Sequence, residues 1–137
     1  MIHEGLFAYL AADAGVLAYV DNGNVVRIFR QVIPQKIPEG VPRVPCLVYE
    51  RSGVERQVTY CGTSGLVRST FSIDSYAVKS SIAHELAAAV RDALLDYRGV
   101  MGGIAVSFCS LENEFDLQDI EPGLYRVVQS WSIWHEE

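Results

Sequence analysis

The side chains of this chain that could form a reactive site are its three cysteines and three histidines. A cysteine becomes a nucleophile when a histidine, itself held by a third group, removes its proton. The candidates for such a pair are Cys46, Cys61 and Cys109 on one side and His3, His84 and His135 on the other. Their spacing indicates no third group, and this many thiols and imidazoles in 137 residues form some pairs by chance. A small cytoplasmic Cys–His enzyme is therefore the less favoured alternative.

Three further motifs fall short of known sites. His84-Glu85 begins like the helical zinc-protease motif, but that motif needs a second histidine where this chain has Ala88. Gly62–Gly65 is similar to the serine turn of hydrolases, yet its second glycine comes one residue early and a strand follows. Gly102-Gly103 lacks the other glycines of a dinucleotide-binding loop. The sequence therefore predicts no catalytic residue, no metal ligand and no cofactor.

Composition narrows the possible classes of protein. The cysteines are odd in number and far apart, which argues against a zinc ribbon or a disulfide framework and favours free thiols in a reducing compartment. A net charge of −6 argues against a protein that grips nucleic acid. No apolar run reaches the roughly 18 residues of a membrane span, and the first residues do not form a signal peptide. We expect a protein made in the cytoplasm, without a membrane partner.

Acidic residues gather in one part of the chain. They are Glu112, Glu114, Asp116, Asp119 and Glu121. A solvated loop is the first interpretation, because runs of like charge usually lie in water. A surface that repels DNA is the alternative.

The elements that position these residues are clearest between Leu66 and Leu94. Hydrophobicity there alternates first, as in a half-buried strand, with Phe71 and Ile73 on one face and Arg68, Thr70, Ser72 and Asp74 on the other. It then takes the helical period, so that one helical face carries Ile82, Leu86, Val90 and Leu94. A strand that leads directly into a helix predicts a compact α+β core.

The other predicted elements complete one domain of residues 1–137. They are a helix at 3–14, a short turn at 16–20, a strand at 24–29, a proline-rich connector at 31–45, a hairpin of 46–51 and 54–60 with a turn at Ser52-Gly53, a loop at 61–65, a link at 97–103, a strand from 104, an acidic excursion at 112–123 and a last strand to His135. The order α-β-β-β-α-β-β predicts an α+β fold: an antiparallel or mixed sheet with two helices packed on one face.

The last strand places its two tryptophans on opposite faces. Trp131 belongs to the core face, whereas Trp134 belongs to the outer face. Large aromatic side chains on a polar face are enriched at protein interfaces, although a loop could equally cover this one. Tyr76 and Val48 could share the outer face and form a modest apolar patch with Trp134.

Taken together, the chain resembles the tail-completion, or tail-terminator, proteins of long-tailed bacteriophages and gene transfer agents. The resemblance covers nearly the whole length. It rests on the segments LAADAGVLAYV, VPCLVYERSG, GTSGLVRSTFSIDSYA, ELAAAVRDAL, SLENEFDLQDIEPGLYRV and SWSIWH, in this order and at these spacings. Neighbouring neck proteins, such as a head-side connector or stopper, are the alternative within the same kind of particle.

This resemblance implies a structural virion protein with no enzymatic activity. Such subunits form a ring, usually of six, that caps the tail tube, meets the head connector and lets DNA pass without specific binding; the particle is assembled in the host cytoplasm. A ring needs two different patches on each subunit. Our candidates are the outer sheet face around Trp134, Tyr76 and Val48 and the polar helix face with Arg91 and Asp92. Glu112, Glu114 and Asp116 are candidates for the channel or an end surface.

Overall fold

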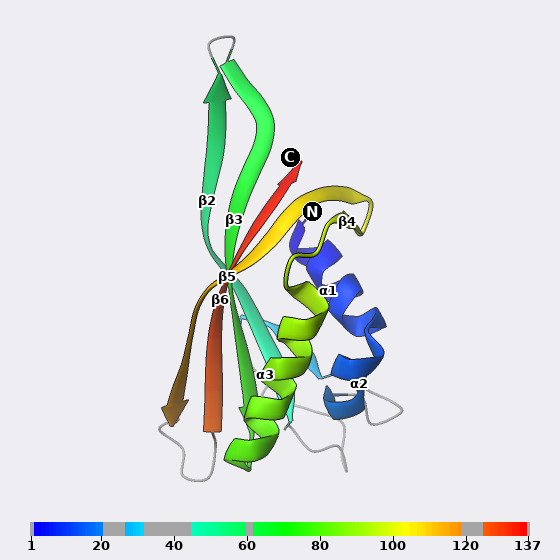
Figure 1. The fold of residues 1–137 in the computed structure, drawn as a ribbon, viewed down its shortest axis with the longest axis vertical. Helices are drawn as coiled ribbons and strands as arrows, with labels where there is room; N and C mark the ends of the chain where they lie inside the picture. Colours follow the sequence, from blue (N-terminus) through cyan, green and yellow to red (C-terminus); the bar gives the residue numbers. More distant parts are fainter. Residues whose placement is uncertain (1, 21–26, 32–44, 60–61, 119–124, 137) are drawn as a thin grey trace.

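The computed structural model describes residues 2–20, 27–31, 45–59, 62–118 and 125–136. Three helices cover one face of a six-stranded sheet (Figure 1). The elements are α1 (Ile2–Ala12), α2 (Ala14–Val20), β1 (Ile28–Arg30), β2 (Cys46–Thr59), β3 (Gly62–Ala77), α3 (Ser80–Leu94), β4 (Gly99–Met101), β5 (Ile104–Gln118) and β6 (Tyr125–Glu136). The sheet order is β1-β2-β3-β6-β5-β4, with β1 parallel to β2 and the other neighbours antiparallel. The predicted α+β class with a mixed sheet is confirmed.

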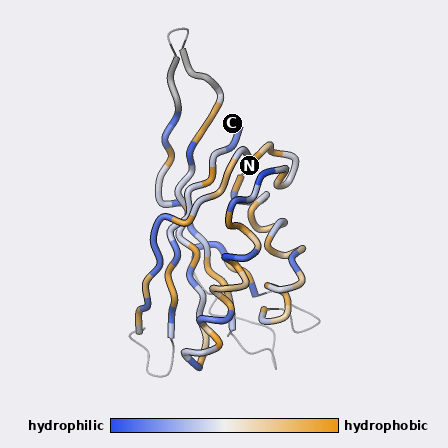
Figure 2. The backbone as a smooth tube through the Cα atoms, viewed as in Figure 1, coloured by the Kyte–Doolittle hydropathy of each residue, from blue (hydrophilic) through white to orange (hydrophobic). Residues whose placement is uncertain are grey.

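The strand–helix unit at the centre of the chain has the predicted faces. In β3, Phe71 and Ile73 are fully buried, and in α3 the side chains of Leu86, Val90 and Leu94 are fully buried. They form one core with Trp131 of β6 and with residues of α1 and α2. Figure 2 shows that the helices beside the sheet contain many apolar residues. Burial of each such side chain contributes about 1.5–3 kcal/mol, so this layer holds the helices on the sheet.

The N-terminal helix ends earlier than predicted, and a second helix replaces the predicted turn at 16–20. The break is at Asp13, whose Oδ1 accepts a hydrogen bond of 3.1 Å from the Val16 backbone N–H. An aspartate that caps a backbone N–H in this way begins a new helix. Val16 and Val20 are fully buried, which holds α2 against the core.

The predicted turn at Ser52-Gly53 is wrong, because β2 runs through it as one strand. A register shift between Arg51 and Gly53 leaves the strand bulged rather than reversed. A glycine inside a strand often marks a bulge, because it adds a residue without a side chain to place. β2 instead reverses into β3 after Thr59, and Gly62–Gly65, predicted as a loop, belongs to β3.

Two segments predicted as irregular are strands. Gly99–Met101 forms β4, and Glu112–Gln118 is the second half of β5, paired with β6. Charged residues disfavour strands weakly, and the ladder with β6 outweighs that preference. Only residues 28 and 29 of the predicted strand at 24–29 fall in β1. Its first three residues and most of the proline-rich connector lie outside the described residues.

Candidate functional site

The polar face of α3 is joined to β5 by two charged pairs. His84 Nε2 lies 3.0 Å from Asp116 Oδ2, and Arg91 Nη1 lies 3.1 Å from Glu114 Oε2. His84 and Arg91 lie seven residues apart, which is two helical turns, so both project from the same face of α3. Glu114 and Asp116 alternate with Phe115 and therefore share one face of the strand. We call these four residues the α3–β5 seam.

The hydrogen bonds of His84 define its charge. Its Nδ1 lies 2.9 Å from the Ser80 carbonyl oxygen, which can only accept, and its Nε2 faces the Asp116 carboxylate, which also accepts. Both acceptors are satisfied together only in the imidazolium form, in which both ring nitrogens donate. The hydrogen bond to Asp116 is the main reason that the pKa of His84 is raised above 6.5.

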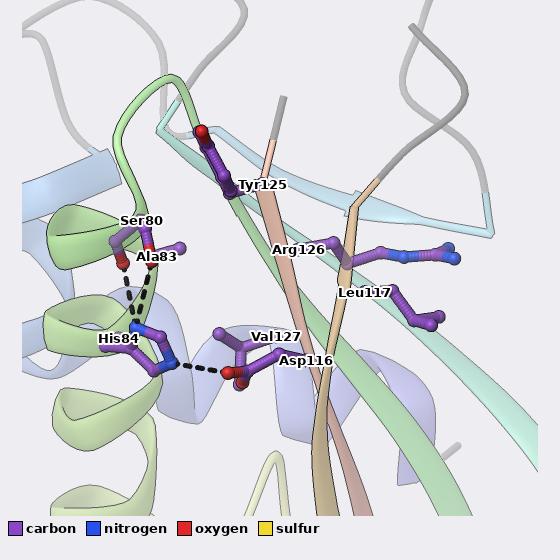
Figure 3. A pocket seen from close by; sticks show the side chains of 8 residues that line it. All are labelled: Ser80, Ala83, His84, Asp116, Leu117, Tyr125, Arg126 and Val127. Carbon is purple, nitrogen blue, oxygen red and sulfur yellow. Dashed lines mark hydrogen bonds and ion pairs between the residues drawn. The ribbon is translucent and has the colours of Figure 1, made fainter. Parts of the chain in front are cut away.

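A cavity of about 210 Å³ lies beside this histidine (Figure 3). It is lined by Ser80, Ala83, His84, Asp116, Leu117, Tyr125, Arg126 and Val127. Ser80, His84 and Asp116 have the residue types of a hydrolase triad, but the bonding differs. The Ser80 hydroxyl lies 3.5 Å from Nδ1, whose proton is already donated to the Ser80 carbonyl. The imidazole therefore has no lone pair with which to activate that hydroxyl.

The seam continues into the core through Gln129. This fully buried amide donates from Nε2 to the Ala87 carbonyl at 3.0 Å and to Glu114 Oε1 at 3.2 Å. Its Oε1 accepts from Trp131 Nε1 at 3.3 Å. Two of these hydrogen bonds connect β6 to α3 and to β5, and the third lies within β6, so the buried amide is occupied by protein groups.

The cysteines are poor nucleophiles where the structure describes them. Cys46 and Cys109 are fully buried free thiols, and burial raises the pKa of each to about 12. A thiol with such a pKa stays protonated at neutral pH. Cys61 lies outside the described residues.

The other two histidines do not complete a reactive site either. His135 Nδ1 donates to the Glu136 carbonyl at 2.7 Å, and its Nε2 meets the Ser69 hydroxyl at 2.7 Å. Ser69 is fully buried, which keeps this pair from a substrate. Burial lowers the pKa of His3, a buried residue at the start of α1. Within the described ranges, no group of His, Cys, Asp and Glu is arranged to hold a metal ion.

The three predicted channel acids are divided between the two faces of the sheet. β5 has a register shift between Leu111 and Asn113, at Glu112. Glu114 and Asp116 therefore point toward α3, whereas Glu112 lies on the outer face, where Ser110 Oγ donates to it at 2.9 Å. Hydrogen bonds from Ser110 and then Ser132 lower the pKa of Glu112.

The predicted interface residues of the sheet do not form one patch. Trp134 pairs with Arg68, whose guanidinium lies 5.9 Å from the centre of its ring. Tyr76 pairs with Arg126 at the other end of the same two strands. Tyr76 and Val48 lie together in a small buried cluster with Cys46. The three residues share the outer face, but the strand register separates Trp134 from the other two.

The two predicted interface residues of α3 have different surroundings. Arg91 is held by Glu114 in the seam. Asp92 lines a shallow groove of about 510 Å³ between α2 and α3, together with Asp13, Gly15, Ala18, Tyr19, Glu85, Ala88, Ala89 and Ala93. No basic residue lines this groove among those described. The pairing in the seam has no local signal in the sequence, because its partners are 23 and 32 residues apart.

Comparison with known proteins identifies the family. A family model described as "Tail completion protein gp17" matches residues 4–136. A solved chain described as "Virion of native gene transfer agent (GTA) particle" has the same fold, with a TM-score of 0.71 and 18% identity over 96% of this chain and 92% of that chain. No curated protein matches by sequence. No helix within the described residues is long and apolar enough to cross a membrane.

Proposed function

The chain belongs to the tail completion protein gp17 family and is a structural component of a virion tail, and from this premise we propose that residues 1–137 act as one domain that assembles into a ring of six copies. The ring ends the tail tube, binds the tube on one side and the head connector on the other, and leaves a channel for DNA. The observation that carries the proposal is the family match over nearly the whole chain.

The charge of the molecule supports a channel that does not retain DNA. The net charge is −6, and Glu112, with the Arg68 guanidinium 3.9 Å away, is a carboxylate on the face of the sheet that no described helix covers. Like charge repels phosphate at short range and is screened beyond about 8–10 Å. We assign the channel or end surface to this face, with Glu112 as its acid, since Glu114 and Asp116 lie on the opposite, helix-covered side of the sheet.

We also propose that the protein has no enzymatic activity. The thiols of Cys46 and Cys109 stay protonated, and the imidazole of His84 cannot act as a base toward Ser80. The seam to which His84 belongs joins a helix to a strand, which is a structural task.

Deletion of the gene tests the proposed station in the particle. Electron microscopy of particles from the deletion strain should show tails of irregular length that are not attached to filled heads, and the wild-type gene supplied in trans should restore them. Tails of normal length beside heads that have lost their DNA would instead indicate a head-side stopper. Normal attached tails would disprove both roles.

A further inference from the structure

The sheet has two edges that its short outer strands cover only in part. β1 pairs with Leu47–Tyr49 of β2, and β4 pairs with Ile104–Val106 of β5. Beyond these segments, no described strand pairs with the outer edge of β2 from Glu50 to Thr59 or of β5 from Ser110 to Gln118. Exposed strand edges present backbone donors and acceptors that readily pair with another chain.

These two edges carry opposite charges on the same face of the sheet. Arg51 and Arg56 pair with Phe71 and Val67, whose side chains are buried on the helix side, so both arginines project from that side. On β5, Glu114 and Asp116 also project toward the helices. All four residues are exposed, so on this face the β2 edge carries two arginines and the β5 edge carries two carboxylates, each of which also bonds a cation of α3.

Large apolar side chains also lie exposed along both edges. Val54 on β2 is 39% exposed, and Phe115 and Leu117 on β5 are 43% and 40% exposed. Protected edges usually carry charges that repel another strand. Here the exposed apolar groups and opposite charges favour pairing of one edge with the other.

The direction of the strands fits an edge-to-edge contact between copies related by rotation. β2, β3, β6 and β5 alternate in direction, so β2 and β5 run opposite ways. The β5 edge of one copy would therefore meet the β2 edge of the next as an antiparallel pair, with the helices of both copies on one side.

The free parts of the two edges lie at opposite ends of the sheet, with Glu50 of β2 level with Asn113 of β5 across the ladder. If the uncovered part of one edge pairs with the uncovered part of the other, each copy is displaced along the strand direction relative to its neighbour. A closed ring can contain this displacement only if the strands are tilted relative to the ring axis. Strands in closed barrels are tilted by about 35–45°, so such a shift is ordinary.

We propose that neighbouring copies join by pairing the β2 edge of one, with Arg51 and Arg56, to the β5 edge of the next, with Glu114 and Asp116. The occupant of each edge is thus a second copy of this chain. Because the two edges differ, the contact is heterologous and repeats around a ring. This inference rests on the proposed ring and names the surfaces that build it.

Two charge-reversal variants test the contact in particles from the deletion strain. Arg51→Glu/Arg56→Glu makes both edges acidic, and Glu114→Arg/Asp116→Arg makes both basic. Either variant alone should lower the titre of functional particles by about 100-fold relative to the wild-type gene, because like charges then face each other. Expressed together, the two variants can alternate around an even-numbered ring, and the titre should return to within about tenfold of wild type.

The control is Lys79→Glu/Glu85→Lys, which exchanges two charges on α3 and its N-terminal flank, outside the four residues of the proposed contact, and should leave the titre unchanged. Thermal unfolding establishes that each variant is folded. If the Glu114→Arg/Asp116→Arg variant is not folded, the single variant Asp116→Arg replaces it, because that variant keeps the Arg91–Glu114 pair.

A wild-type titre from either reversal alone, or no recovery from the mixture of folded variants, overturns the proposed contact. The ring itself would survive that result, because its own test is the tail length of the deletion strain complemented with the wild-type gene.

Discussion

At the scale of the residue, polar side chains in this protein act through partners far along the chain. His84 donates from both ring nitrogens, to Ser80 and to Asp116, and Gln129 joins α3 to Glu114 and Trp131. Taken singly, these residue types suggest acid–base chemistry. Their bonding shows instead that the donors and acceptors are occupied in holding α3 on the sheet.

The His84–Asp116 pair makes stability depend on pH. Because folding raises the pKa of His84 above 6.5, the pair stabilises the protein at a pH below 6.5, and this contribution is lost as the pH rises through the raised value. Both side chains are at least half exposed, so we expect at most about 1 kcal/mol. Urea unfolding of wild type and Asp116→Asn should differ at mildly acidic pH and coincide in alkaline buffer. An equal difference at both would contradict the pairing.

Gln129 should contribute more to the free energy of unfolding than the His84–Asp116 pair does, because its side chain is fully buried. Replacement by Ala leaves the Ala87 carbonyl and the Trp131 indole N–H without their partner, and we expect a loss of about 1–3 kcal/mol in the free energy of unfolding. Ser130→Ala, on the half-exposed outer face of the same strand, is the matched control in urea titrations. Equal stability of the two variants would rule out the network as a stabilising feature.

At the scale of the element, close backbone contacts set where the helices lie. α1 crosses β4 at Gly5, where an added Cβ would come within 2.5 Å of the Met101 carbonyl oxygen. Gly102 faces the same crossing, with a positive φ of 56° that favours glycine. Gly5 and Gly102 are therefore needed to seat α1 on the sheet.

Gly5→Ala should separate α1 from β4 and cost about 1–3 kcal/mol, as expected for overpacking. Gly53→Ala is the control, because nothing lies within 4 Å of an added Cβ there, and it should stay within about 0.5 kcal/mol of wild type. Thermal and urea unfolding measure both. A Gly5→Ala protein as stable as Gly53→Ala would show that the crossing tolerates a wider spacing.

At the scale of the whole molecule, the described helices cover one face of the sheet, and no described element covers the other face or the outer parts of two strand edges (Figure 1). The core is built without a disulfide between Cys46 and Cys109, which are both fully buried. The reactivity of these two thiols should therefore depend on unfolding of the whole domain.

In a Cys61→Ser background, a thiol-directed reagent should label Cys46 and Cys109 only as fast as the protein unfolds. Burial and a pKa of about 12 keep both thiols protonated and out of reach at neutral pH. Mass spectrometry should find no adduct on the native protein and two adducts in urea. Rapid labelling of the native protein would revive the Cys–His alternative.

The sequence alone determined the features that depend on local period and composition. Hydrophobicity indicates which faces are buried, through the alternation around Phe71 and the helical spacing of Leu86, Val90 and Leu94. Burial of apolar surface is the dominant favourable term in folding. The fold class followed from the order of these segments, and the family followed from their spacing along the chain.

Only the tertiary structure decided which polar residues meet. The bulge at Glu112 turns the acids of one segment to opposite faces, and the strand register separates Trp134 from Tyr76. Glu112–Gln118 is a strand because β6 supplies its ladder, although its own residues favour a solvated loop. Register, bulges and ion pairs depend on partners distant in the chain, and a local pattern contains no record of them.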